Sequence, residues 1–173
     1  VQYHLIMSKT IILLGSARKD SHTRTLLRNV FNGIDHDLVD LLDFKIAPFD
    51  YNAKYPEGDQ FQDLADRMVE AENIVFATPV YWYAMSGILK NFMDRFTDLV
   101  SVNKEKGRAL AGKNVYLFSV GADQFHPHGF EVPFRETAKY LGMKYHEGVY
   151  ISSRGENFEA VQVAQNTFQR QLG

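Results

Sequence analysis

Short apolar runs alternate along this chain with longer segments in which apolar residues recur every three or four positions. The runs of strand length lie at 9–15, 37–43, 73–78, 114–120 and 144–152. The segments of helical period lie near 22–33, 59–72, 86–101, 130–142 and 156–171. Short apolar runs indicate strands, and a period of 3.6 residues indicates amphipathic helices. Their alternation predicts an α/β fold in which helices cover a parallel sheet.

Two of the predicted strands, 74–77 and 115–118, are almost wholly apolar. Strands covered by helices on both faces have this character, so we expect these two at the centre of the sheet. Ligands of open parallel sheets bind beyond the carboxyl ends of the strands. The segments that follow three of the strands, 16–23, 79–86 and 119–129, are therefore expected to converge on one site.

Length and charge limit the partners of the chain. The 173 residues contain no repeat, low-complexity tract or linker, which predicts one domain over 1–173. Met7-Ser8-Lys9 resembles a natural start, so residues 1–6 are candidates for a non-native extension. A net charge of -2 offers no long-range attraction for nucleic acid or an anionic membrane. No apolar run approaches the ~18 residues of a membrane span. We therefore expect neither nucleic acid nor a membrane as a partner.

The chain has no cysteine. Disulfides, thiolate-held iron–sulfur clusters and nucleophilic cysteine chemistry are therefore excluded. Residues 1–6 also lack the basic and apolar regions of a signal peptide. Together these features favour a cytoplasmic location.

The segment 16–24 follows the first strand and opens the first helix. Gly15 ends the strand, and the hydroxyl-bearing residues that follow it include Ser16, Ser21 and Thr23. Backbone N–H groups and hydroxyls at a helix N-terminus bind anions, and Arg18 adds a fork of donors. Neither G-x-x-x-x-G-K-[ST] nor G-x-G-x-x-G is present, which argues against a nucleoside triphosphate or a dinucleotide at this loop. A single terminal phosphate fits better.

The loop after the third strand carries three successive aromatic residues, Tyr81, Trp82 and Tyr83. Pro79 stiffens the turn, and backbone N–H groups at 82–84 are suited to the polar edge of an aromatic ligand. Taken alone, such a loop serves equally well to cover the end of the sheet or to make a subunit contact. Beside a phosphate loop, a flat heteroaromatic ligand is the favoured interpretation.

The predicted helix at 86–101 has apolar residues at 88, 89, 92, 93, 96, 99 and 100. Ser86 is its expected N-cap, and Lys90 and Asp94 are expected to form a solvated pair. The apolar face is broad for one packing surface, so we expect a second copy of the chain to bury part of it.

Two motifs occur in order, each at the end of a predicted strand. They are Gly15-Ser16-x-Arg18-x-x-Ser21-x-Thr23 and Pro79-Val80-Tyr81-Trp82-Tyr83-x-Met85-Ser86-Gly87-x-Leu89-Lys90-Asn91-Phe92-x-Asp94-Arg95. With them the chain resembles, over most of its length, the NAD(P)H-dependent FMN reductases and quinone reductases of the flavodoxin-like superfamily. The resemblance implies a doubly wound, five-stranded parallel sheet in the order 2-1-3-4-5, with helices on both faces.

The resemblance also implies which residues bind FMN. The phosphate would lie on Ser16, Arg18, Ser21 and Thr23, with His22 as a further candidate that faces solvent equally well. The isoalloxazine ring would lie on Pro79, Val80, Tyr81, Trp82, Tyr83 and Ala84. A third contact would come from Ser119, Val120 and Gly121, where glycine allows close approach of the backbone to the ring.

The implied activity is transfer of hydride from NADH or NADPH, through bound FMN, to a quinone, a flavin or a similar small acceptor. No catalytic side chain is required, because a flavin carries the redox chemistry. The resemblance implies a homodimer with the flavin near the interface. The alternative is a flavodoxin-type electron carrier that binds FMN without nicotinamide-dependent activity, and a domain that has lost its cofactor is a third interpretation. Arg18 and the near-neutral charge favour the reductase.

Two histidines, His126 and His128, lie one residue apart in a polar segment, 123–129, that we expect to overhang the site and shape substrate choice. Such a pair can bind a metal. No third ligand of suitable spacing lies nearby, and a surface loop containing proline also explains the pair, so no metal site is predicted. Arg24 and Arg28 are expected to be ordinary charges on a helix surface.

Overall fold

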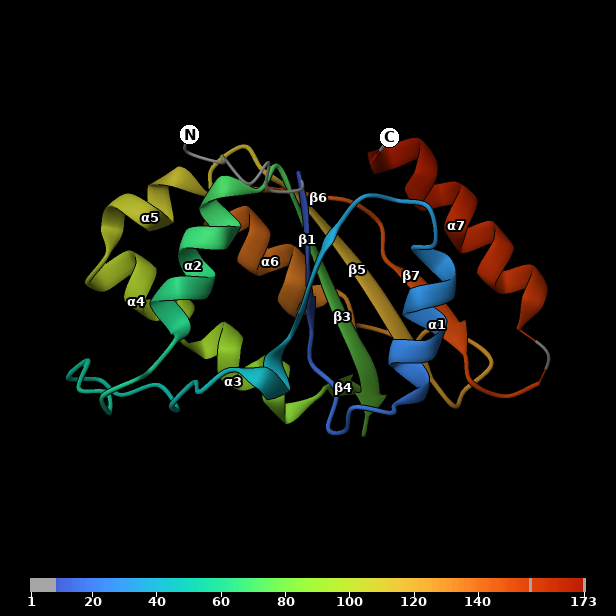
Figure 1. Cartoon of the computed structure of the whole chain (residues 1–173), viewed down its shortest axis with the longest axis horizontal. Coiled ribbons are helices and arrows are strands. Elements are labelled where there is room, and N and C mark those ends of the chain that lie inside the picture. The colour runs from blue at the N-terminus through green and yellow to red at the C-terminus, as the bar shows by residue number, and fades with distance from the viewer. Residues whose placement is uncertain (1–8, 156, 173) are drawn as a thin grey trace, which may run out of the picture.

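The structure is a computed structural model that describes residues 9–155 and 157–172. The prediction that residues 1–6 are a non-native extension lies outside this range. A parallel sheet follows the path β2-β1-β3-β5-β6, with β7 also paired to β5 (Figure 1). The parallel strands are β1 (Thr10–Leu14), β2 (Asp37–Asp40), β3 (Asn73–Tyr81), β5 (Asn114–Gly121), β6 (Lys144–Tyr145) and β7 (Val149–Ser152). β4 (Ala84–Met85) pairs antiparallel with the end of β3.

The predicted α/β class is confirmed, but the prediction of five strands is wrong. The five predicted strand segments lie in the sheet in the predicted order, 2-1-3-4-5. The last of them, 144–152, is however divided into two strands, β6 and β7. The reason lies at Gly148, whose N–H donates to a carboxylate oxygen of Glu131 at 3.1 Å. A Cβ at Gly148 would lie 3.0 Å from the Glu131 carboxyl carbon, so a larger residue here would push the carboxylate away. The chain therefore turns toward Glu131 between the two strands.

The central strands are buried on both faces, as predicted. β1 and β3 pair along the whole of β1, and β3 pairs with β5 from Asn73 to Pro79. Alternate side chains of these strands enter two separate apolar clusters, one on each face of the sheet. The alternation follows from the period of two in a strand.

Helices cover both faces (Figure 1). One face packs against α1 (His22–Val30) and α7 (Phe158–Leu172). The other face packs against α2 (Phe61–Glu70), α3 (Gly87–Asp94), α4 (Phe96–Ser101) and α6 (Val132–Tyr140). The short helix α5 (Lys104–Ala109) packs against α4, and a 3₁₀ turn, η1 (Leu41–Asp43), follows β2. No helix among the described residues combines the length and the apolar character needed to cross a membrane.

The predicted helix at 86–101 is two helices, α3 and α4, which meet at Arg95. The Arg95 side chain is 1% exposed and turns inward to two carboxylates, those of Asp59 and Asp98. The change of direction lets one chain bury most of the broad face, namely Leu89, Phe92, Met93, Phe96 and Leu99, while Ile88 is half-buried and Val100 is 37% exposed. The expectation that a second copy covers part of this helix stays a prediction. The Ser86 cap and the Lys90–Asp94 pair are confirmed.

Candidate functional site

The segments that follow β1, β3 and β5 meet at the carboxyl edge of the sheet, as the sequence predicts. Gly15 N–H donates to the carbonyl of Ala77 at 2.9 Å, which continues the pairing of β1 with β3 beyond the strand end. The Ser86 hydroxyl donates to the Gly15 carbonyl at 2.5 Å, and Ser86 N–H donates to the Thr78 hydroxyl at 3.0 Å. The start of the predicted phosphate loop and the end of the aromatic loop are thus bonded directly to each other.

Gly15 makes this junction possible. A Cβ at Gly15 would lie 2.6 Å from Cβ of Leu89 and 3.1 Å from its backbone nitrogen. Side chains do not tolerate such distances, so only glycine lets the N-terminus of α3 rest on the end of β1. Ser86 then caps α3 by accepting from Leu89 N–H at 3.2 Å.

Ser16 is the residue of this edge whose hydrogen bonding is incomplete. Its side chain is buried, 1% exposed, and its hydroxyl oxygen has no hydrogen-bond partner among the described residues. A buried, unpartnered hydroxyl costs about 1–3 kcal/mol. It stands one short loop before the N-terminus of α1, where Ser21 accepts from Arg24 N–H at 3.1 Å. A phosphate oxygen is an acceptor that fits both the hydroxyl and the helix N-terminus.

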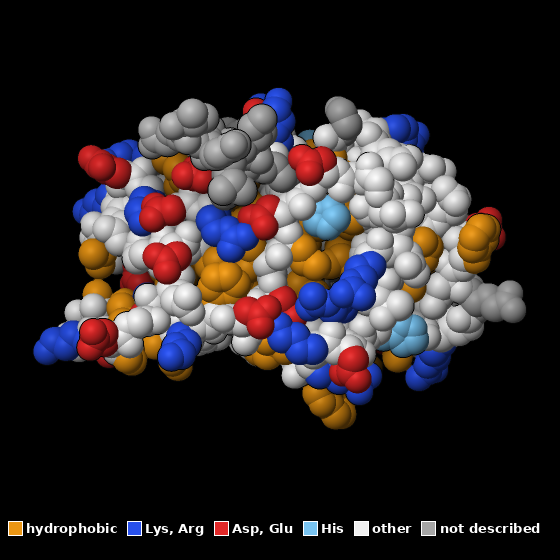
Figure 2. Space-filling model, viewed as in Figure 1, with side chains coloured by type: hydrophobic (Ala, Val, Ile, Leu, Met, Phe, Trp, Pro, Cys, Tyr) orange, Lys and Arg blue, Asp and Glu red, His pale blue; other side chains and the backbone are white. Residues whose placement is uncertain are grey.

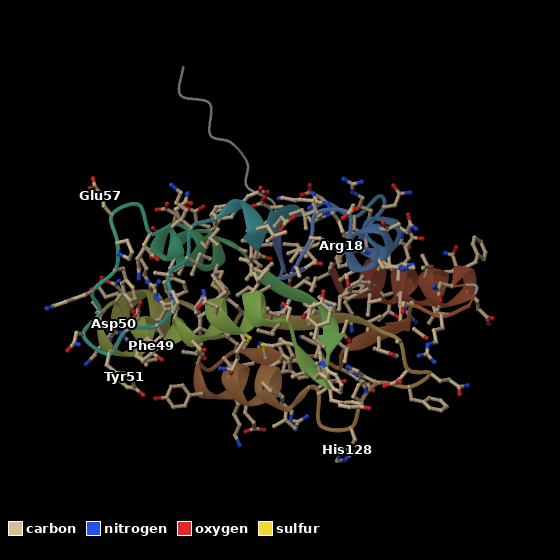
Figure 3. The ribbon with its side chains drawn as sticks, turned by 90° about the horizontal axis from the view of Figure 1, so that it is seen from below. Arg18, Phe49, Asp50, Tyr51, Glu57 and His128 are labelled. Carbon is tan, nitrogen blue, oxygen red and sulfur yellow. The ribbon has the colours of Figure 1, made fainter. Side chains whose placement is uncertain are left out.

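The structure does not bring all the predicted phosphate residues together. Ser16, Ser21 and Thr23 are buried around the loop. His22 is exposed, and the Arg18 side chain is 71% exposed and lies 3.8 Å from the Asp20 carboxylate (Figure 3). The guanidinium therefore lies at the rim of the loop rather than over Ser16.

Arg24 is not the ordinary surface charge that the sequence predicts. It donates to the buried carboxylate of Asp40 at 2.5 Å, and Lys19 bridges Asp40 and Asp43 at 3.1 and 2.5 Å. The two carboxylates raise the pKa of Lys19, with the hydrogen bond to Asp43 as the main cause. Asp40 in turn accepts from Leu42 N–H at 3.0 Å. The cluster joins α1 to the end of β2, and a carboxylate directly after the apolar Leu38-Val39 was its signal in the sequence.

The aromatic loop is a tight hairpin with an unusual backbone. Trp82 and Tyr83 have φ values of 49° and 63°, and they join β3 to β4 through the pairs Val80–Met85 and Tyr81–Ala84. Such turns favour glycine or asparagine, and a left-handed conformation costs other residues roughly 1–2 kcal/mol each.

The aromatic side chains of this hairpin point away from the core. Trp82 is 93% exposed, Tyr83 68% and Tyr81 44%. Figure 2 shows apolar side chains protruding at the edge where β3 ends. Backbone strain without interior packing is typical of a segment shaped for binding.

In the third predicted segment, 119–121, the side chains face the interior, so the backbone is the part available at the carboxyl edge of the sheet. Val120 packs into the core, and the fully buried Ser119 hydroxyl lies 3.1 Å from Nε2 of His126. A Cβ at Gly121 would lie 2.8 Å from the Tyr150 hydroxyl and 3.1 Å from Cβ of Val80, so a larger residue would have to displace one of these side chains.

The two histidines of the next loop differ. His126 is partly buried between Ser119 and Glu131, whereas His128 is exposed and points outward (Figure 3). Within residues 9–155 and 157–172, no three His, Asp or Glu side chains form a group that could hold a metal.

The parallel sheet with helices on both faces is the architecture of a flavodoxin-like α/β protein. The Trp repressor binding protein from Bacillus subtilis superposes with a TM-score of 0.72 at 22% identity, over 91% of this chain and 97% of that one. The FMN-dependent NADH-azoreductase from Bacillus anthracis str. Ames Ancestor, solved in complex with FMN, superposes with a TM-score of 0.69 at 11% identity, over 96% and 100%.

Residues 8–157 match the model of the NADPH-dependent FMN reductase family, and the chain belongs to that family. YwqN of Bacillus subtilis (strain 168), which bears the name NAD(P)H-dependent FMN-containing oxidoreductase, is 24% identical over 147 residues, 79% of this chain and 81% of that protein. The FMN-dependent NADPH-azoreductase of Staphylococcus haemolyticus (strain JCSC1435) is 35% identical over 95 residues, and the match spans 50% of each chain. The chain is thus an NAD(P)H-dependent flavin oxidoreductase with FMN as its cofactor.

Proposed function

We propose that this enzyme holds FMN along the carboxyl edge of its sheet and reduces a small acceptor, a quinone, a free flavin or an azo compound, with NADH or NADPH as donor. The observation that carries the proposal is the buried Ser16 hydroxyl, which lacks a partner among the described residues and stands before the N-terminus of α1. Buried polar groups are rarely left without a partner, and Ser16 is the unpartnered one that lies at this edge of the sheet among the described residues.

The phosphate of FMN is assigned to the loop after β1. Arg24 N–H is bonded to the Ser21 hydroxyl and Thr25 N–H to the Ser21 carbonyl, so the N–H groups of His22 and Thr23 remain as donors at the start of α1. The Ser16 hydroxyl is a further donor at the start of the same loop. Arg18, at the rim, has the length and the exposure to close over the phosphate from outside.

The isoalloxazine ring is assigned to the hairpin at 79–84 and to the backbone of 119–121. FMN, when bound, supplies the redox chemistry. The chain's own residues then have to bind and orient: Tyr81, Trp82 and Tyr83 form an aromatic wall that holds the nicotinamide and the acceptor in turn. The rigid hairpin and Pro79 keep that wall in place. No acid–base side chain is needed for this scheme.

The test is an absorbance experiment on FMN-reconstituted protein under anaerobic conditions. NADH and NADPH are added separately, and each reduced sample then receives a quinone or an azo dye. We expect rapid loss of the oxidised flavin absorbance with at least one donor and its recovery with the acceptor. A flavin that stays oxidised with both donors would favour the electron carrier instead. Failure to retain FMN would overturn the assignment of the site.

We further propose a homodimer in the cytoplasm, in which a second copy covers the aromatic edge. Trp82 and Phe125 are 93% and 75% exposed on two loops at this edge, and Tyr83 beside Trp82 is 68% exposed, so several aromatic side chains are available there to a second copy. Light scattering after size exclusion gives the mass, and Trp82→Ser should shift it toward the monomer if this edge is the interface. We also propose that 1–173 is one domain, which predicts a single unfolding transition.

A further inference from the structure

Ser119, His126 and Glu131 form a continuous series of polar contacts beside the proposed flavin site. The Ser119 hydroxyl lies 3.1 Å from His126 Nε2, and His126 Nδ1 lies 3.3 Å from Glu131 Oε1. The other oxygen of Glu131 accepts from the Tyr145 hydroxyl at 2.6 Å and from Gly148 N–H at 3.1 Å. These contacts thus link the end of β5 to the start of α6 and to the segment between β6 and β7.

The imidazole of His126 is also held by its ring faces. It stacks on Tyr150 of β7, with centroids 5.0 Å apart and planes at 14°, and its ring centroid is 5.0 Å from that of Phe130. The Tyr150 hydroxyl donates to the carbonyl of Asp123 at 2.6 Å. Since 122–131 contains no helix or strand, these contacts and the buried side chain of Phe130 anchor the loop to the rest of the fold.

The contacts indicate the proton positions on the ring. Glu131 is an acceptor, so we infer that Nδ1 carries the proton and that Nε2 accepts from the Ser119 hydroxyl, which also lies 3.4 Å from the carbonyl oxygen of Val149. Burial lowers the pKa of His126, which outweighs the opposing effect of Glu131. The Tyr150 side chain, with its hydroxyl, stacks on the imidazole. His126 also lines an open cavity of about 700 Å³ together with Tyr145, Arg135 and Glu147. The neutral imidazole therefore matches its surroundings.

We propose that His126 is a positioning residue for the flavin. By binding the Ser119 hydroxyl on one side and Glu131 on the other, it turns the Ser119 side chain away from the site and presents the backbone of 119–121 at the carboxyl edge. The inference rests on the proposed function, because it assumes that FMN lies against this backbone. It assigns to His126 no contact with the substrate and no proton transfer.

Four single variants test the proposal. His126→Ala removes both bonds, whereas His126→Gln keeps an acceptor for the Ser119 hydroxyl. His128→Ala is the matched control, because His128 is exposed in the same loop. Tyr145→Phe removes a bond to the same Glu131 carboxylate without touching Ser119, and so measures the effect of lost stability alone.

The measurements are the FMN dissociation constant, from quenching of flavin fluorescence, and the rate at which chymotrypsin cleaves the apoprotein after Phe125. For His126→Ala we expect FMN binding about tenfold weaker, the effect of one lost interaction of about 1.4 kcal/mol, and faster cleavage after Phe125. His126→Gln should recover most of the FMN affinity. His128→Ala and Tyr145→Phe should bind FMN nearly as the wild type does.

The outcomes separate this inference from the proposed function. If wild-type protein binds FMN and His126→Ala binds it equally well, the positioning role is wrong while the flavin site stands. If Tyr145→Phe weakens FMN binding as much as His126→Ala, the effect is one of stability and the proposal fails. If wild-type protein does not bind FMN, the proposed function is overturned, and with it this inference. The cleavage rate then still decides whether His126 anchors the loop.

Discussion

Arg95 and Asp59 form a two-pronged ion pair in the interior, with Nη1 2.9 Å from Oδ2 and Nη2 3.0 Å from Oδ1. Arg95 Nε also donates to Asp98 at 2.9 Å, and the guanidinium lies 3.4 Å from the centre of the Tyr55 ring. Nη1 donates in addition to the carbonyl of Ala47. One buried arginine therefore fastens the long connection 44–60, from which Phe49 and Tyr51 project (Figure 3), to the junction of α3 and α4.

Replacing this arginine should destabilise the fold strongly. Arg95→Met leaves two carboxylates buried without their cation, for which a loss of about 3–5 kcal/mol in the free energy of unfolding is typical. Urea denaturation followed by circular dichroism measures it. The matched control is Lys90→Met, which breaks an exposed pair with Asp94 and should cost less than about 0.5 kcal/mol. Equal losses in the two variants would contradict a structural role for the buried pair.

The same pair predicts an acid-sensitive contribution to stability. Burial alone would raise the pKa of Asp59, but the hydrogen bonds from Arg95 and from the N–H groups of Ala47 and Phe61 lower it below its ordinary value of 3.8. A carboxyl whose pKa is lower in the folded state stabilises the fold fully above its unfolded pKa. That stabilisation is lost as the pH falls below 3.8 toward the folded value. Wild-type protein should therefore lose stability more steeply than Asp59→Asn over this range, measured by urea denaturation at successive pH values. Parallel curves would count against the pair.

Ser16→Ala should separate stability from binding. The variant removes a buried hydroxyl that lacks a partner among the described residues, so the apoprotein should be unchanged or more stable by about 1 kcal/mol. FMN should bind about tenfold more weakly because a charge-assisted hydrogen bond is lost. Riboflavin, which lacks the phosphate, is the control ligand, and its affinity should not change. An equal loss for both ligands would place Ser16 away from the phosphate.

Gly15→Ala should damage the junction of the two ligand loops. The added methyl would lie 2.6 Å from Cβ of Leu89, so β1 and α3 must separate, and we expect a loss of about 1–3 kcal/mol together with weaker FMN binding. Gly87→Ala is the control, since a Cβ there meets nothing within 4 Å and alanine favours the first turn of α3. Thermal unfolding and FMN titration measure both variants. Similar behaviour of the two would refute the steric argument.

Trp82→Gly should relieve strain while it impairs function. Glycine adopts the φ of 49° without a Cβ penalty, and the indole is 93% exposed in the single chain, so the unfolding free energy of the monomer, measured at high dilution, should stay equal or rise by up to about 1 kcal/mol. Turnover with NAD(P)H and a quinone should fall, because part of the aromatic wall is gone. Steady-state kinetics and thermal unfolding check this pair of effects. A variant that loses stability but keeps its activity would show that Trp82 serves packing.

The elements that the sequence predicted well are those whose signal is local. The run 74–77 is apolar because both faces of β3 are covered, and such burial imposes the same character on any central strand. The Ser86 cap and the Lys90–Asp94 pair depend on residues three and four positions apart, which a helix brings together by itself.

The elements that were missed depend on distant partners. The break at Arg95 exists because Asp59, 36 residues earlier, takes the guanidinium into the interior. The last predicted strand is divided because Glu131, 17 residues before Gly148, accepts its N–H. Arg24 looked like a surface charge because Asp40, 16 residues later, is brought beside it only when β2 pairs with β1.

By itself, then, the sequence determined the α/β class, the central strands and the positions of the three loops at the carboxyl edge, because burial and helix capping leave periodic and local patterns. Tertiary structure alone decided which hydroxyl is left unsatisfied, which arginines turn inward and that His126 rather than His128 is anchored. Those outcomes depend on the desolvation and pairing of groups from separate elements, and the energy of such a pair is set by distances that no local pattern records.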